Sequence, residues 1–150
     1  MKVALGCDHA GFPLKETVIK ELKELGHEVL DFGTNSCDAA DFPDYAEAVA
    51  KAVAGGKARR GILLCGSGVG MCITANKIKG ARASVAHDVY AAEQGVQHED
   101  MNILCLGARV AGYGVAPYLV RAFLAAEFEG KERQVRRLNK ILKIEEANFK

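Results

Sequence analysis

Short apolar runs alternate along this chain with stretches in which apolar side chains recur every three or four positions. The apolar runs predict strands at residues 3–5, 28–32, 62–65, 83–86 and 103–106. The helical spacing between and after them predicts helices at 13–25, 43–54, about 70–78, from about 89, 114–126 and 131–146. Runs that are apolar throughout, rather than alternating, are typical of strands buried on both faces. The pattern therefore predicts a three-layer, doubly wound (Rossmann-like) α/β domain over residues 1–150, with a parallel sheet of about five strands and a C-terminal helix.

Composition and charge restrict the class of protein further. With 49% hydrophobic and 26% charged residues, the chain resembles an ordinary folded domain and not a disordered, fibrous or membrane protein. A net charge of +1 gives no sign of a nucleic-acid partner. The average conceals an uneven distribution, because residues 131–150 hold seven basic and three acidic groups, or net +4. Five cysteines without a C-x-x-C pair predict reduced thiols and a cytoplasmic location.

Ligands of doubly wound sheets bind beyond the carboxyl ends of the strands. The residues that follow the predicted strands are therefore the candidates for a site. They are Asp8 and His9, residues 65–70, His87 with Asp88, and the loop after Leu106.

The strongest local signal is the glycine-rich loop at residues 65–70, Cys-Gly-Ser-Gly-Val-Gly. Its glycines let the backbone turn tightly and direct several N–H groups at one point. The positive N-terminal end of the helix that follows favours an anion, an oxyanion or a Cys65 thiolate at that point. Met71 stands where a dinucleotide fingerprint needs glycine and where a cysteine phosphatase needs arginine, and the Gly-Lys-Ser/Thr of a P-loop is absent. The alternative is a plain strand-to-helix turn with a packed cysteine.

The remaining polar candidates are weaker when taken alone. Asp8 and His9 are suited to binding sugar hydroxyls or relaying protons, but they are equally suited to an Asx-type turn with a solvent-facing imidazole. His98 lies in a predicted loop before a strand, where a histidine is usually just exposed. No set of cysteines, histidines and carboxylates has zinc spacing, so we expect no metal.

The basic C-terminal helix adds a possible phosphate site. Arg133 and Arg137 are four residues apart and share the face opposite its apolar stripe. Such a face is either solvated or grips a phosphate with two guanidinium groups. Because it points away from the helix's own apolar stripe, a site completed by these arginines, with Arg109, could belong to a second subunit.

Four motifs in order carry a resemblance to a known family. They are GCDHAGF at 6–12, DFPDY at 41–45, GILLCGSGVG at 61–70 and ANK at 75–77. Together they resemble ribose-5-phosphate isomerase B, a family that includes the galactose-6-phosphate isomerase subunits, and the likeness runs from Met1 to about Ile144. It implies an aldose–ketose isomerase of a sugar phosphate, without metal or cofactor. It also implies a homodimer, or a tetramer of paired dimers, with active sites shared between subunits and the helix at 131–146 packed on the partner.

The resemblance also implies roles for individual residues. Cys65 matches the base that moves a proton between C1 and C2, and His98 matches the acid–base group that opens the furanose ring. The matches to groups that stabilise the enediolate or bind the sugar and its phosphate are Asp8, His9, Gly66, Ser67, Gly68, Val69, Gly70, Arg109, Arg133 and Arg137.

Four departures from the family pattern bear on the substrate. Glu99 stands where the family usually has Asn, Phe42 where it has Tyr and Ser67 where it has Thr, and Arg133 aligns across a one-residue insertion. We expect a ribose 5-phosphate isomerase. The alternatives are an isomerase of a hexose or tetrose phosphate, and a non-catalytic sugar-phosphate binding protein on the same fold.

Overall fold

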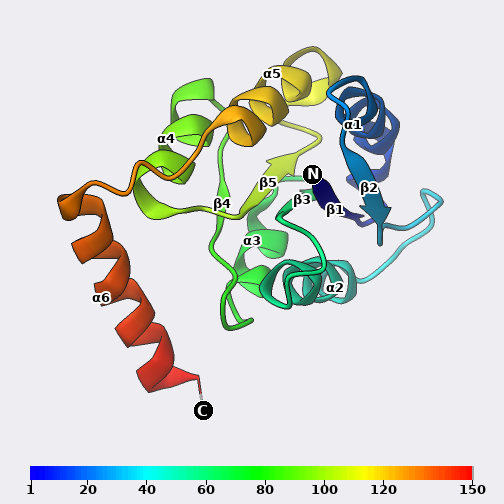
Figure 1. The fold of residues 1–150 in the computed structure, drawn as a ribbon. Coiled ribbons are helices and arrows are strands. Elements are labelled where there is room, and N and C mark those ends of the chain that lie inside the picture. Colours follow the sequence, from blue (N-terminus) through cyan, green and yellow to red (C-terminus); the bar gives the residue numbers. More distant parts are fainter. Residues whose placement is uncertain (150) are drawn as a thin grey trace.

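The computed structural model describes residues 1–149 and contains one parallel sheet of five strands in the order β2-β1-β3-β5-β4 (Figure 1). All four neighbouring pairs run parallel, which confirms the predicted α/β class. The strands are β1 (Lys2–Cys7), β2 (Glu28–Asp31), β3 (Arg60–Cys65), β4 (Ala83–Val85) and β5 (Ile103–Gly107).

Helices cover both faces of this sheet. α1, α4 and α5 pack on one face and α2 and α3 on the other, each group around its own buried cluster. Pro13 and Pro43 stand in the first turns of α1 and α2, where the fixed φ of proline suits a helix start. The helices are α1 (Phe12–Glu24), α2 (Phe42–Ala54), α3 (Val69–Ala75), α4 (Val89–Glu99), α5 (Gly112–Ala125) and α6 (Glu132–Asn148).

Two strand glycines let α2 lie unusually close to the sheet. A Cβ at Gly61 would stand 2.7 Å from Cγ1 of Val49, and one at Gly6 would stand 2.9 Å from Cγ2 of the same valine. Because α2 follows β2 and runs back across the sheet, its N-terminus lies at the carboxyl edge. Phe42 therefore lies beside the loops that follow β1 and β3.

The C-terminal helix α6 stands apart from the body of the domain (Figure 1, red). Gln134 is the one fully buried residue among those described in it. Its far end is tied to the domain by Glu145, whose Oε1 accepts the Gly80 N–H at 2.8 Å. No helix within residues 1–149 is long and apolar enough to cross a membrane.

The ends of α3 and α4 differ from the sequence prediction for reasons that the structure shows. α3 ends at Ala75 and not near Ile78, because the Asn76 side chain pairs with the Ala83 backbone (Nδ2 to O 2.8 Å, N to Oδ1 2.9 Å) and draws the chain out of the helix. The prediction that His98 lies in a loop is wrong. It stands in the last turn of α4, which ends only where Asp100 adopts a left-handed conformation with φ +52°.

Candidate active site

Loops after β1, β3 and β5 form a cleft of about 420 Å³ at the carboxyl edge of the sheet, within the usual size of a small-molecule site. Parallel strands end at the same edge, so residues distant in sequence meet there. The residues that line it include Asp8, Cys65, Gly66, Ser67, Gly70 and Arg109. The structure thus gathers these six predicted site residues around one volume.

Cys65 is the last residue of β3 and is 6% exposed. Its Sγ accepts a hydrogen bond from the Gly68 backbone N–H at 2.9 Å. Gly68 directs that N–H by adopting φ +83°, a left-handed conformation that suits glycine. An N–H donor aimed at sulfur is a charge-assisted hydrogen bond when the sulfur carries a negative charge.

The loop after β5 is joined to the Cys65 loop by backbone hydrogen bonds. The Ala108 N–H donates to the Cys65 carbonyl at 2.8 Å and the Arg109 N–H to the Gly66 carbonyl at 3.1 Å. His87, a candidate by its position after β4, accepts the Gly107 N–H on Nε2 at 2.9 Å and so supports this loop. These contacts hold the Arg109 guanidinium beside Gly66, in the same cleft as the thiol.

Asp8 and His9 have different roles after β1. Asp8 forms the Asx turn, because its Oδ1 accepts the N–H groups of Ala10 and Gly11, each at 2.9 Å. The His9 ring is not simply solvent-facing. Its Nδ1 lies 3.1 Å from the Ala40 nitrogen and 3.2 Å from the Ala40 oxygen, which fixes the ring against the loop before α2.

Lys15 anchors that same loop, a role that no pattern in the sequence indicated. Its buried ammonium group lies 2.7 Å from Asp31 Oδ2, 2.9 Å from the Thr34 carbonyl and 3.0 Å from Asn35 Oδ1. A lysine in the first turn of α1 carried no local signal, because its partners come from β2 and the following loop.

Phe42 forms an apolar wall of the cleft. A Cβ at Gly70 would lie 2.9 Å from Cε2 of this ring, so the ring rests directly on the glycine. Gly70 therefore serves packing as well as the turn, and the wall offers a substrate no hydroxyl group.

The other described cysteines lie outside the cleft. Burial raises the pKa of Cys7 to about 11, and burial also raises the pKa of Cys105. A hydrogen bond from Cys105 lowers the pKa of Cys72 to about 7, but Cys72 packs against Ala83 on the far side of α3. Within residues 1–149, no group of three or more Cys, His, Asp and Glu side chains is placed to hold a metal ion.

Four predicted site residues are not brought to this cleft. His98 and Glu99 end α4 just before β5, at the amino edge of the sheet. β3 and β5 pair from Gly61 with Ile103 to Cys65 with Gly107, so the two edges are roughly 13 Å apart at a rise of about 3.3 Å per residue. Arg133 and Arg137 lie on α6. Gly68 and Val69 belong to the loop without lining the cleft, Gly68 buried and Val69 exposed.

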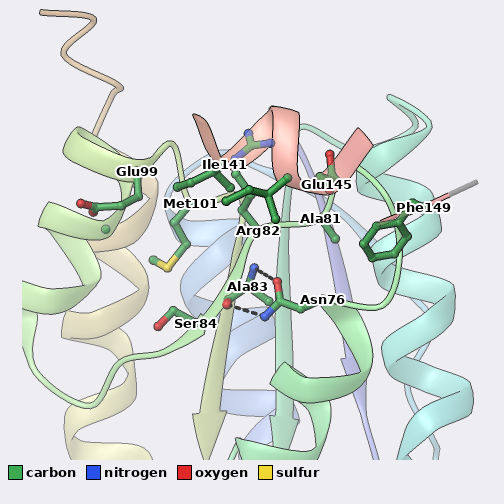
Figure 2. Close-up of a pocket in the computed structure, with 12 residues that line it drawn as sticks. Asn76, Ala81, Arg82, Ala83, Ser84, Glu99, Met101, Ile141, Glu145 and Phe149 are labelled. Atoms are coloured by element: carbon green, nitrogen blue, oxygen red, sulfur yellow. Dashed lines mark hydrogen bonds between the residues drawn. The ribbon is translucent and has the colours of Figure 1, made fainter. Parts of the chain in front are cut away.

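A second pocket of about 420 Å³ separates α6 from the rest of the domain (Figure 2). Figure 2 shows Ile141 and Glu145 of α6 facing Arg82 and Met101, with the Asn76–Ala83 hydrogen bonds below them. Glu99 lines this pocket. The pocket is lined by apolar side chains such as Met101 and Ile141 together with the carboxylates Glu99 and Glu145, and no cysteine lines it.

Proton transfer next to a carbonyl needs a base together with groups that stabilise the developing oxyanion. The carboxyl-edge cleft holds a thiol at Cys65, a glycine-rich loop with backbone N–H groups and the Arg109 guanidinium. The class that this fold and cleft define is an isomerase of small phosphorylated carbonyl compounds.

Comparisons with known proteins give the family. The family described as Ribose/Galactose Isomerase matches residues 3–141. Ribose-5-phosphate isomerase B of Escherichia coli is 49% identical over 90% of this chain and 91% of its own length. D-erythrulose-4-phosphate isomerase of Pectobacterium atrosepticum is 41% identical over 87% of this chain and 86% of its own length.

A solved structure agrees with these relatives. Ribose-5-phosphate isomerase B of Clostridium thermocellum superposes with a TM-score of 0.95 at 44% identity, covering 98% of this chain and 99% of that one. The chain therefore belongs to the ribose/galactose isomerase family, and it is an aldose–ketose isomerase of sugar phosphates.

Proposed function

We propose that this enzyme interconverts ribose 5-phosphate and ribulose 5-phosphate through an enediolate, with Cys65 as the base. The observation that carries the assignment of the base is the position of Cys65, the one described cysteine that lines the carboxyl-edge cleft and one whose sulfur receives an N–H donor. The names of the relatives in Escherichia coli and Clostridium thermocellum support the substrate.

The proposed reaction moves one proton between neighbouring carbons. The Cys65 thiolate removes the C2 proton of the open-chain aldose, and the electron pair becomes the double bond of the enediolate. The thiol returns the proton to C1 while the O2 proton passes to O1, so the product is the ketose and the thiolate is restored. The loop N–H groups and Ser67 stabilise the oxyanion, and Arg109 with Asp8 orients the sugar phosphate.

We further infer a homodimer with shared active sites. Within one chain, His98 and Glu99 of α4 and Arg133 and Arg137 of α6 do not line the cleft that holds Cys65. A second copy would bring them to the cleft, and α6 offers a surface for it. Among its exposed side chains are the apolar residues Val135, Ile141, Leu142 and Ile144. We expect the cytoplasm as its location, as the reduced thiols predict.

A panel of aldose phosphates tests the substrate and the base together. We expect turnover of ribose 5-phosphate by the wild type and loss of at least roughly 10²-fold in kcat by Cys65→Ala, the lower end for a positioned acid–base group. Cys37→Ala, at an exposed cysteine in a loop, is the matched control. If a tetrose or hexose phosphate is turned over faster, that sugar phosphate is the substrate and not ribose 5-phosphate. Binding without turnover of any sugar phosphate would favour a non-catalytic role. Full activity of Cys65→Ala would show that Cys65 is not the base.

Mixing two inactive variants tests the shared site. Cys65→Ala and His98→Ala each damage every site of their own homodimer. In a mixed dimer, shared sites place both defects in one site and leave the other intact, so about a quarter of wild-type activity should return after subunit exchange. No recovery, with mixed dimers confirmed by mass spectrometry, would place both residues in the site of a single chain. Light scattering gives the mass and distinguishes a dimer from a tetramer.

The phosphate arginines have a separate test. Arg137→Ala should raise KM far more for ribose 5-phosphate than for free ribose, because only the former carries the charge that the guanidinium binds. Lys140→Ala, on an exposed position of the same helix, is the control. An equal rise in KM for both sugars would refute the phosphate role.

A further inference from the structure

Glu129 stands in the segment between α5 and α6, against the last turn of α4. Its backbone N–H donates to the Gln97 carbonyl at 3.0 Å, which fixes this segment beside His98. Its Oε2 lies 2.7 Å from Gln134 Nε2 and 2.8 Å from Lys131 Nζ. The same oxygen lies 4.0 Å from His98 Nε2.

The Gln134 amide and the Lys131 ammonium hold this carboxylate in place and keep it charged. Gln134 is 1% exposed and is the buried residue of α6, so its amide is a fixed donor. Hydrogen bonds from Lys131 and Gln134 lower the pKa of Glu129. The carboxylate does not line the Cys65 cleft of its own chain.

His98 is the group that this anion faces. The imidazole ends α4, where the carbonyl dipoles of the helix also attract a cation. Lys131 is bonded to the same carboxylate oxygen of Glu129, and Glu99 follows His98 in sequence.

We propose that Glu129 is a positioning residue that places a fixed negative charge beside His98 and stabilises the charge that the imidazole carries when it acts in the opening of the sugar ring. The proposal rests on the proposed function, because it assigns work to His98 in the isomerase reaction. A separation of 4.0 Å is too long for a hydrogen bond. Glu129 therefore acts through its charge and leaves the His98 Nε2–H free to donate to a substrate in the partner subunit's cleft.

Ring opening conserves protons at this residue. The imidazolium gives its proton to the ring oxygen O4 as the C1–O4 bond breaks and the electron pair of O1 forms the carbonyl. The imidazole then takes the proton that O1 carried. The charged form of His98 is thereby restored, and Glu129 stabilises it at the start and at the end of the step.

This role concerns a cyclic substrate only. Ribose 5-phosphate closes to a furanose through its free O4. Ribulose 5-phosphate cannot form a five-membered ring, because the O5 that closure requires carries the phosphate. When ribulose 5-phosphate is the substrate, the open-chain aldose that forms can leave the enzyme and close in solution. A group that acts on the ring therefore limits only the reaction that starts from the furanose, whereas a group that holds the fold or binds phosphate is needed in both directions.

The test measures both directions of the reaction for the wild type, Glu129→Gln, Glu129→Asp and Glu127→Gln. Glu127 is the matched control, since it is two residues away, 61% exposed and paired with Arg59 on the surface. We expect Glu129→Gln to lower kcat from ribose 5-phosphate roughly ten- to a hundredfold, less than the whole acid–base contribution. It should leave kcat from ribulose 5-phosphate within about twofold. Glu129→Asp should recover part of the loss, and Glu127→Gln should match the wild type.

His98→Ala completes a double-mutant cycle. If Glu129 acts through His98, adding Glu129→Gln to His98→Ala should cause no further loss with ribose 5-phosphate. Equal losses in both directions, no loss, or additive losses in the cycle would each overturn the proposal while leaving the isomerase intact. Absence of wild-type turnover with either sugar would instead overturn the proposed function, and this inference with it.

Discussion

Gly68 is the position at which a single methyl group tests the geometry of the loop that follows Cys65. Replacement by alanine has two costs in the native conformation. A φ of +83° is strained for alanine by about 1–2 kcal/mol. The new Cβ would also stand 3.1 Å from the Leu106 carbonyl carbon and 3.3 Å from the Gly107 nitrogen, backbone atoms of β5 that cannot move aside. Overpacking of this kind adds about 1–3 kcal/mol.

The expected result is a free energy of unfolding lower by about 2–5 kcal/mol for Gly68→Ala, measured by urea denaturation. If the loop relaxes instead, it withdraws the N–H that bonds Cys65, and isomerase activity falls with a smaller loss of stability.

Gly26→Ala is the control for this variant. Gly26 has a similar φ of +77°, but a Cβ there would meet nothing within 4 Å. It should lose only the conformational part, about 1–2 kcal/mol, and keep full activity. Equal stability losses for the two variants, with full activity in both, would refute the claim that the close approach of the loop to β5 shapes the site.

Three further predictions concern single groups. Lys15→Met should lower the free energy of unfolding by about 2–3 kcal/mol, because it removes the buried ammonium of a side chain that is 7% exposed. Lys20→Met, at a side chain that is 76% exposed, should change the free energy of unfolding little. Equal urea midpoints for the two variants would contradict this. Burial and the N-terminal ammonium lower the pKa of His27, so the unfolded chain binds the His27 proton more tightly than the folded chain does. The free energy of unfolding of the wild type should therefore fall as the pH drops below about 6.5, and it should fall more steeply than that of His27→Gln. Parallel curves of urea midpoint against pH for the two proteins would argue against this. The pKa of about 7 at Cys72 predicts a pH profile of its iodoacetamide labelling, followed by peptide mass spectrometry, with a midpoint near that value and not near 9.0.

Local pattern was sufficient for the fold class. Runs such as Ile62–Cys65 are apolar on both faces, and only a strand covered by helices on both sides satisfies that pattern. The Cys65 loop was equally visible, because its glycines, its cysteine and its place after a strand are adjacent in sequence. Boundaries failed where a side chain competed with the backbone, as Asn76 does at the end of α3.

Neighbouring residues along the chain were enough to predict the alternation of strands and helices, the carboxyl edge of the sheet as the place of a candidate site, and the glycine-rich loop at residues 65–70. Which residues share a cleft depends on the order of the strands in the sheet, which the local pattern does not contain. The order β2-β1-β3-β5-β4 brings Asp8, Cys65 and Arg109 together at the carboxyl edge of the sheet and leaves His98 at its amino edge. The pairings of Lys15 with the loop after β2 and of Glu129 with His98 are of the same kind. They depend on how segments that are distant in sequence pack against one another, whereas the hydrophobic and polar pattern reflects only interactions between residues that are close in sequence.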